Sequence, residues 1–338
     1  MPFEIVHDDI TRLKTDAIVN ATNPWQEVGS GVSRAIYEAA GYDQLAEACR
    51  PYGKLNYGDA FATSGIRLPV KYIIHTAAPG FAGGLDGEYE LLKACYRNSL
   101  RLAMRLKCES IAFPLLGSGG QGYPEQVAFR LASDVIQNFL LENDLEIKLV
   151  IYDRSTTRPP VEMEAHIQSL MARFQRNDAI WQKQASGDFA EPDTEYKVFP
   201  MASPRKMAKP DTREALEERL QMMQTSFSPA LLRLIDQKGM SDAQVYKKAN
   251  LTRQHFSKIR SNPAYVPSKM TVLALAVALE LSVEQTQNLL SRAGYTLSKS
   301  IKADLIVEYF LQRKYYDIYR INEALFFYDQ PLLGARVS

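Results

Sequence analysis

The sequence predicts an α/β domain of three layers with a mixed sheet, followed by an all-helical domain. Over residues 1–153, short apolar runs alternate with helical patterns, as they do in layered α/β folds. From residue 226 onward only helical patterns remain, and a polar, proline-containing stretch separates the two regions. We therefore expect an α/β domain at 1–175, a linker at 176–225 and a helical domain at 226–338.

The strands of the first domain are predicted from short runs rich in Ile, Val and aromatic residues, which are typical of buried strands. These runs are "FEIVH", "DAIVNA", "DAFATSG", "KYIIHTAA", "SIAFPLL" and "IKLVIYD". Helical patterns lie between them at 31–40, 43–50, 88–107 and 124–142. In the last of these, one apolar face at period four is formed by Val127, Leu131, Val135 and Phe139.

Helical patterns continue after the last predicted strand. One covers 159–175 and begins at two prolines, and a charged helix is expected at 211–224 within the linker. In the second domain, helices are expected at 228–236, 241–249, 251–260, 267–281 and 282–294, with two more in an aromatic tail between 301 and 328. Ser-based caps and glycines mark several of their ends.

Composition excludes several classes of protein. The 338 residues carry a net charge of +1, and 46% are hydrophobic and 23% charged, as in soluble proteins with proper cores. No apolar run reaches the roughly 18 residues needed to span a bilayer, and the start lacks the pattern of a secretion signal. The three cysteines have no CxxC spacing and the four histidines are scattered, so we expect no metal site and a cytoplasmic location.

Two loops of small residues stand at strand-to-helix junctions. The first is "GSGV" at 29–32 and the second is "GSGGQG" at 117–122. Each can offer backbone N–H groups to an anion, and two such loops could hold a diphosphate from opposite sides. Neither has the Lys-Ser/Thr pair of a P-loop, and neither places the GxGxxG order directly after the first strand, as a dinucleotide-binding turn does. The alternative is that both are tight turns required by the fold.

Residues 3–155 resemble the macro domain family, the ADP-ribose-binding modules. The resemblance rests on "DDIT", "DAIVNATN", "GSGV", "LPVKYIIHTAAP" and "GSGGQGYP", which occur in the family's order and spacing. It implies a macro-like fold and ADP-ribose as ligand, with no cofactor required. His75, in "IIHT", is interpreted as a structural strand residue and not as a catalyst.

The resemblance also implies roles for individual residues. Asp9 would accept a hydrogen bond from the adenine amino group, with the Ile10 backbone beside it, and Tyr152 would stack on adenine. Asn23 would contact the distal ribose and is the one candidate catalytic residue. The two loops would line the diphosphate with Gly29, Ser30, Gly31 and Val32 and with Gly117, Ser118, Gly119, Gly120, Gln121, Gly122 and Tyr123.

The residues at this site favour binding over chemistry. The family's hydrolases place an aspartate just after the first glycine loop, whereas this chain has Ser33, which cannot act as a carboxylate base. Gln121 also stands where the family often has an aromatic residue. Binding without efficient turnover is therefore favoured. Hydrolysis assisted by the substrate, or by Asp8, Asp9 or Glu27, remains an alternative.

The helical domain resembles the helix-turn-helix of Cro-type repressors over 228–294, carried by "SDAQVYKKANLTRQHFSKIR". Between 226 and 300, ten Lys and Arg residues stand against four Asp and Glu residues. The resemblance implies that Thr252, Arg253, Gln254 and His255 face base edges and that Lys258 and Arg260 suit phosphates. The alternative is a helical interaction module, since Ala249 and Asn250 replace the glycine often found in the turn.

The sequence thus predicts a reader or sensor of ADP-ribose, or of an ADP-ribosylated macromolecule, joined to a module that binds DNA or a protein partner. Two alternatives stay open: an ADP-ribosyl hydrolase acting on protein or nucleic acid, and a DNA-binding transcriptional regulator. The aromatic tail suits either a packed helix pair or the interface of a homodimer. No membrane partner is expected.

Overall fold

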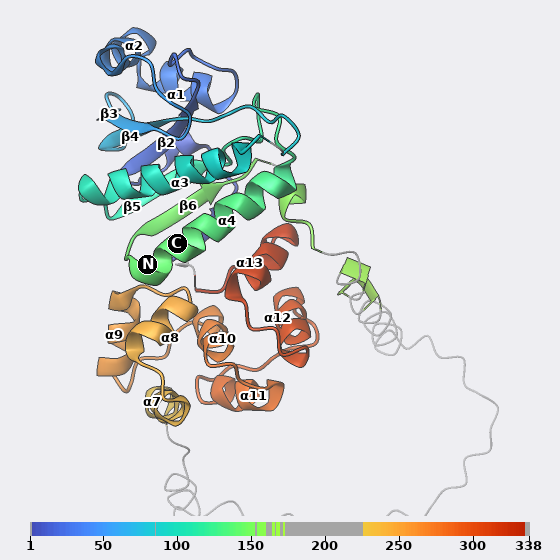
Figure 1. Cartoon of the computed structure of the whole chain (residues 1–338). Coiled ribbons are helices and arrows are strands. Elements are labelled where there is room, and N and C mark those ends of the chain that lie inside the picture. The colour runs from blue at the N-terminus through green and yellow to red at the C-terminus, as the bar shows by residue number, and fades with distance from the viewer. Residues whose placement is uncertain are drawn as a thin grey trace, which may run out of the picture.

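The computed structural model describes residues 2–84, 86–152, 154–159, 164–165, 167–169, 172 and 226–334. The predicted linker at 176–225, its charged helix and most of the predicted helix at 159–175 lie outside these residues. Within them, the chain forms an α/β domain and a helical domain packed against one edge of its sheet (Figure 1).

All six predicted strands are confirmed. They form one sheet in the order β1-β6-β5-β2-β4-β3, with β3 antiparallel to β4 and every other pair parallel. The predicted mixed sheet is therefore confirmed as well. The strands are β1 Phe3–Val6, β2 Ala17–Thr22, β3 Ala60–Ser64, β4 Tyr72–Ala77, β5 Ser110–Pro114 and β6 Glu146–Val150.

Helices cover both faces of the sheet and complete the three predicted layers. Two pack on one face around Ile36, Tyr37 and Leu45: α1 Val32–Ala40 and α2 Tyr42–Cys49. Two longer helices lie side by side on the other face: α3 Glu88–Arg105 and α4 Glu125–Glu142 (Figure 1). Three short 3-10 helices join these elements: η1 Ile10–Arg12, η2 Arg50–Tyr52 and η3 Arg154–Thr157.

The buried stripe of α4 is offset by one residue from the face noted in the sequence. Of the predicted face, Val135 is buried but Val127, Leu131 and Phe139 are only partly buried. The neighbouring stripe of Ala128, Ala132, Ile136 and Leu140 is buried throughout. Small alanine side chains let the helix approach the strands closely, which the larger residues at the edge would not allow. The sequence pattern therefore identified the helix correctly but not its core-facing row.

The helical domain has its own core, centred on a helix that is buried almost throughout. In α10, Thr271 to Ala278 are all buried. It is one of the five helices predicted between 228 and 294, and the other four and the two predicted in the tail are also present. Their bounds are α7 Phe227–Lys238, α8 Asp242–Lys248, α9 Arg253–Ser261, α10 Lys269–Ala278, α11 Val283–Ser291, α12 Lys302–Gln312 and α13 Ile318–Phe327.

Short polar side chains fix where the helices of this domain begin. Ser241 and Ser282 each form a capping box, with Gln244 and Gln285 respectively, so each caps two backbone N–H groups reciprocally. Asp317 accepts from two backbone N–H groups at the start of α13. These caps explain why a polar sequence breaks into so many short, well-defined helices.

The two domains meet along β1, and Asn250 is central to the contact. This residue has a left-handed φ of 54° in the turn between α8 and α9. Its side-chain oxygen accepts from the backbone N of Phe3 at 2.7 Å, and its nitrogen donates to the backbone O of Phe3 at 2.9 Å. The side-chain amide thus pairs the N–H and C=O groups of one residue at the open edge of the sheet, as a neighbouring strand would do there.

Helix α13 completes the junction. It contacts η3 and β1, with the rings of Phe3 and Tyr319 centred 5.9 Å apart, and Phe326 is buried in the core of the α/β domain. Ile167, from the helix predicted at 159–175, is buried in the core of the helical domain. The aromatic residues of the tail are therefore largely used inside one chain, as the predicted packed helix pair requires.

Candidate functional site

The first loop begins where β2 ends, and Asn23 organises it. The side-chain oxygen of Asn23 accepts from the backbone N–H groups of Trp25 and Glu27, each at 3.0 Å. Its nitrogen donates to Glu27 Oε2 at 2.7 Å. A single asparagine thus fixes the turn and also holds a carboxylate beside the loop that follows.

The glycine stretch of this loop leads directly into α1. Gly31 is the residue before the helix and has a φ of 62°, which favours glycine. Among the described residues, no protein acceptor takes the backbone N–H groups of Gly29, Ser30 or Gly31. Free N–H groups at a helix start form a site for an anion. Ser33 lies buried in the first turn, and its hydroxyl has no hydrogen-bond partner in the described part of the chain.

The second loop has the same character. Gly117 has a φ of 90° and packs so closely against the ring of Tyr123 that a Cβ atom would lie 2.8 Å from it. Tyr123 is buried and donates to the backbone O of Glu88 at 3.0 Å, so it supports the loop from beneath. Gly122 closes a turn onto Gly119 at 3.0 Å. The N–H groups of Gly119, Gly120 and Gln121 are without an acceptor among the described residues.

The structure brings the two loops together. A Cβ atom placed on Gly120 would lie 4.0 Å from the hydroxyl of Ser30. The two loops, with their free N–H groups, therefore approach each other beyond the carboxyl ends of β2 and β5. In α/β sheets, ligands bind in the space outside the carboxyl ends of parallel strands.

A third loop, at 79–87, borders this space and was not singled out from the sequence. The backbone N of Phe81 donates to the backbone O of Gln121 at 2.8 Å, and its ring lies 5.1 Å from that of Tyr123. Phe81 thus places an aromatic ring beside Gln121, the position where the sequence lacks one. The small residues of "GFAGG" could have marked this segment as a loop, but nothing in the sequence shows which loops meet in the fold.

Glu88 holds this third loop in shape. It is buried at the start of α3 and accepts from the backbone N–H groups of Ala82, Gly84 and Asp86. Hydrogen bonds from its own N–H and from Gly84, Ala82 and Asp86 lower the pKa of this carboxyl. The Glu88 carboxylate therefore accepts hydrogen bonds from the loop backbone and holds the loop in its conformation.

The predicted adenine-binding residues lie beyond the ends of β1 and β6, on the same side of the sheet as the two loops. Asp9 caps η1, and its Oδ1 accepts from the Thr11 backbone N at 2.9 Å and from the Thr11 hydroxyl at 2.7 Å. These bonds lower the pKa of Asp9. Its Oδ2 lies 3.5 Å from Arg12 and is half-exposed.

Its two predicted neighbours differ in exposure. Ile10 is buried, and its backbone O accepts from Leu13 at 3.4 Å. The side chain of Tyr152 is 94% exposed, while its backbone O accepts from His7 at 2.8 Å. The exposed Tyr152 ring thus follows the end of β6, and Asp9 follows the end of the neighbouring strand β1.

His75 is enclosed beneath the site, in agreement with the structural interpretation from sequence. Its Nε2 lies 3.0 Å from the Thr63 hydroxyl, and its Nδ1 lies 3.2 Å from the Asn20 amide. Burial lowers the pKa of His75 to about 3, so the ring is neutral at physiological pH. A buried neutral ring with both nitrogens engaged fixes β2 against β3 and β4.

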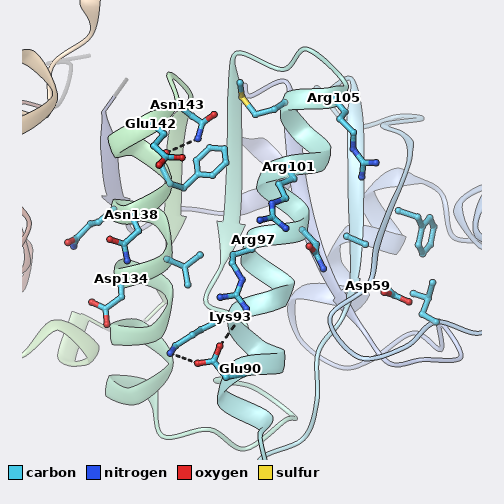
Figure 2. A pocket seen from close by; sticks show the side chains of 18 of the residues that line it. Asp59, Glu90, Lys93, Arg97, Arg101, Arg105, Asp134, Asn138, Glu142 and Asn143 are labelled. Carbon is cyan, nitrogen blue, oxygen red and sulfur yellow. Dashed lines mark hydrogen bonds and ion pairs between the residues drawn. The ribbon is translucent and has the colours of Figure 1, made fainter. Parts of the chain in front are cut away.

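A separate cavity of about 1410 Å³ lies between α3 and α4, and none of the predicted ligand-binding residues lines it. Figure 2 shows Lys93, Arg97, Arg101 and Arg105 along α3, with Glu90 bonded to the first two. Four basic and four acidic side chains line this cavity, so it has no net preference for an anion.

The residues predicted to bind nucleic acid are only partly free. Thr252 is buried and its hydroxyl caps α9 by accepting from the His255 backbone N at 3.0 Å. His255 Nε2 and the Tyr265 hydroxyl are 3.3 Å apart, and Lys258 lies 4.3 Å over the Tyr265 ring. Arg260 pairs with Asp242, whereas Arg253 and Gln254 are exposed on α9.

Two further features bear on the class of the protein. Among the residues that the structure describes, no group of three or more His, Cys, Asp or Glu side chains is placed to hold a metal ion. None of the described helices is both long enough and apolar enough to cross a bilayer.

Comparisons with known proteins concern the α/β half of the chain. A family model described as "Macro domain" matches residues 19–132. The chain is 46% identical over 144 residues to the macro domain-containing protein CT2219 of Chlorobaculum tepidum, a match that covers 43% of this chain and 83% of that protein. It is 42% identical over 160 residues to an O-acetyl-ADP-ribose deacetylase of Citrobacter rodentium, covering 46% of this chain and 90% of that one.

Among solved structures, an Oceanobacillus iheyensis macrodomain with ADP is 38% identical and has a TM-score of 0.43. The match covers 46% of this chain and 85% of the other. Helices α7 to α13 lie outside the residues that the family model matches.

Proposed function

Because the chain belongs to the macro domain family, we propose that its α/β domain binds ADP-ribose, either free or attached to a macromolecule. The observation that carries this proposal is the pair of loops with free N–H groups that approach each other at Ser30 and Gly120. A diphosphate in that space would receive hydrogen bonds from both sides without any lysine or arginine.

The adenine end of the ligand is assigned to Asp9 and Tyr152. The Oδ2 oxygen of Asp9 is half-exposed, so it can accept a hydrogen bond from an exocyclic amine. The exposed ring of Tyr152 offers a stacking face beside it. Asn23 and Phe81 then lie at the distal ribose, on the far side of the two loops.

The test is calorimetry of the full chain with ADP-ribose. Gly120→Val adds an isopropyl side chain where only the Ser30 hydroxyl lies within 4 Å, so it should fill the gap between the loops. We expect affinity to fall at least about tenfold with an unchanged melting temperature, while Gly120→Ala should have a smaller effect. Equal affinity in Gly120→Val and the parent would refute the assignment of this space.

A second candidate function is hydrolysis of an ADP-ribose linkage. Two observations favour it: a relative 42% identical is named O-acetyl-ADP-ribose deacetylase, and Asn23 holds the Glu27 carboxylate at the first loop. Oε1 of Glu27 has no partner among the described residues, so it can take a proton from an attacking water molecule. Glu27 would then supply the carboxylate that Ser33 does not.

We further propose that the helical domain connects ligand binding to DNA or to a protein partner. Helix α9 favours DNA, because it presents Arg253 and Gln254 to solvent at its N-terminal end, where a recognition helix contacts bases. Arg253→Ala should weaken DNA binding and Lys299→Ala, in the same domain, should not. If neither Arg253→Ala nor added salt weakens DNA binding, α9 does not recognise DNA, and binding of a protein partner becomes the favoured role of the domain.

A further inference from the structure

A second pocket lies where the two domains meet, and none of the predicted ligand-binding residues lines it. This junction pocket has a volume of about 850 Å³ and is bordered by α4 and η3 of the α/β domain and by α12 and α13 of the helical domain (Figure 1). Pockets of roughly 300–1,000 Å³ at domain interfaces are typical of small-molecule sites.

The junction pocket is strongly basic. Arg130, Arg158, Arg313 and Arg320 line it, against one carboxylate, that of Glu323. Arg320 already forms two hydrogen bonds with Glu323, at 2.9 and 3.2 Å. Four basic side chains against one acidic side chain distinguish this pocket from the cavity between α3 and α4, where basic and acidic side chains are equal in number.

Two of these arginines are not held in an ion pair by a described residue, although the positive charge of Arg130 favours the ionised form of the Glu323 carboxyl. Arg158 pairs with Glu164 at 2.8 Å, whereas neither Arg130 nor Arg313 forms an ion pair with any residue the structure describes. Arg313 instead lies 3.7 Å over the ring of Tyr309. Guanidinium groups bind phosphate oxygens in a bidentate manner, so two of them in one pocket, Arg130 from α4 and Arg313 at the end of α12, are suited to a phosphate.

An aromatic surface accompanies these charges. Tyr315 is 47% exposed and stacks on the buried ring of Phe310, with ring centroids 5.9 Å apart at 30°. Its outer face is therefore open to a planar group. Phosphate ligands without a ring would make no use of this face.

We propose that the junction pocket binds a nucleoside phosphate, with its phosphate between Arg130 and Arg313 and its base on Tyr315. Such a ligand would contact α4 on one side and α12 and the segment after it on the other, so it would stabilise the docked arrangement of the two domains. None of the residues that line the junction pocket is among those assigned to ADP-ribose.

The experiment is calorimetry of the full chain with GMP, UMP and inorganic phosphate. Purine stacking predicts GMP as the tightest of the three. Combined Arg130→Gln and Arg313→Gln should weaken GMP binding at least about tenfold, because both phosphate contacts are lost. Tyr315→Ala should weaken GMP more than phosphate. Arg105→Gln, an exposed arginine on α3, is the matched control and should have no effect.

Failure of this proposal can be told apart from failure of the proposed function. ADP-ribose binding reports on the two loops, and it should be unchanged by the junction variants, just as GMP binding should be unchanged by Asp9→Ala. Absence of saturable GMP binding, equal binding in the double variant, or phosphate binding as tightly as GMP would each overturn the proposal.

Discussion

The side-chain amide of Asn23 donates to the carboxylate of Glu27 at 2.7 Å, while its oxygen accepts from the Glu27 backbone N at 3.0 Å. The two residues therefore form a closed unit at the mouth of the first loop. A substitution at either position changes the other, so their effects on activity should not be additive.

If the domain hydrolyses an ADP-ribose linkage, Glu27→Gln should slow the reaction about a hundredfold or more, since loss of a general base has effects of this size. Binding of ADP-ribose should change little, because the amide of glutamine can keep the contact with Asn23. Single-turnover release of ADP-ribose measures the first quantity and calorimetry the second. A Glu27→Gln protein that turns over at the parent's rate would exclude Glu27 as the base.

Asn23→Ala provides the comparison for that variant. It removes the group that orients Glu27 and the acceptor of two loop N–H groups, so it should lower both binding and release. Equal losses in Asn23→Ala and in the double variant with Glu27→Gln would show that the two act as one unit.

Thr11 controls the charge on Asp9. The bonds from the Thr11 hydroxyl and backbone lower the pKa of Asp9 below its ordinary value of 3.8, so the carboxyl stays ionised at a lower pH than a free carboxyl would. Thr11→Val removes the hydroxyl bond, so the pKa of Asp9 should rise toward that value. NMR titration of the Asp9 carboxyl measures the change, and an unaltered midpoint would contradict this account.

The buried ring of His75 links stability to pH. Its pKa of about 3 in the folded protein lies below its ordinary value of 6.5, so the unfolded chain binds more protons between these values. Above pH 6.5, titration of His75 therefore does not reduce the free energy of unfolding. As the pH falls from 6.5 toward 3, that free energy decreases by at most about 1.4 kcal/mol per pH unit. His75→Gln should remove this dependence.

Hydrogen exchange of the β2 and β4 amides reports unfolding of the α/β domain and therefore measures this effect. In the parent, protection should fall more steeply below pH 6.5 than in His75→Gln after correction for intrinsic rates. Identical slopes would mean that His75 does not remain neutral in the folded domain.

Asn250 should dominate the docking of the two domains. Asn250→Gly keeps the left-handed backbone but leaves the N–H and C=O groups of Phe3 unpaired, at a cost of about 2–4 kcal/mol. Asn250→Ala should cost about 1 kcal/mol more because of its positive φ. Exchange of the Phe3 amide measures the loss, and parent-like protection in Asn250→Gly would show that other contacts suffice.

The strands and the helices could be predicted because each depends on a local pattern. The runs "DAIVNA" and "KYIIHTAA" are too apolar and β-branched to be anything but buried strands in this setting. The paired glycine loops were predicted for the same reason, since small residues between a strand and a helix are visible in the sequence.

What could not be predicted depends on contacts between distant parts of the chain. Asn250 stands in the turn of an expected helix pair, but its partner Phe3 lies 247 positions away. The role of Phe81 depends likewise on its loop meeting Gln121. In α4 the two candidate rows, led by Val127 and Ala128, differ by one position, and only packing against the sheet decides between them.

The side chain of Asn250 also has a consequence for self-association. Among the strands that the structure describes, β1 pairs only with β6, so its other side would expose unpaired N–H and C=O groups to any extended chain in solution. The helical domain covers that side with Asn250 and buries Phe326 in the neighbouring core. A truncated α/β half would carry an unprotected sheet edge next to an apolar surface, and it should aggregate where the whole chain stays dispersed.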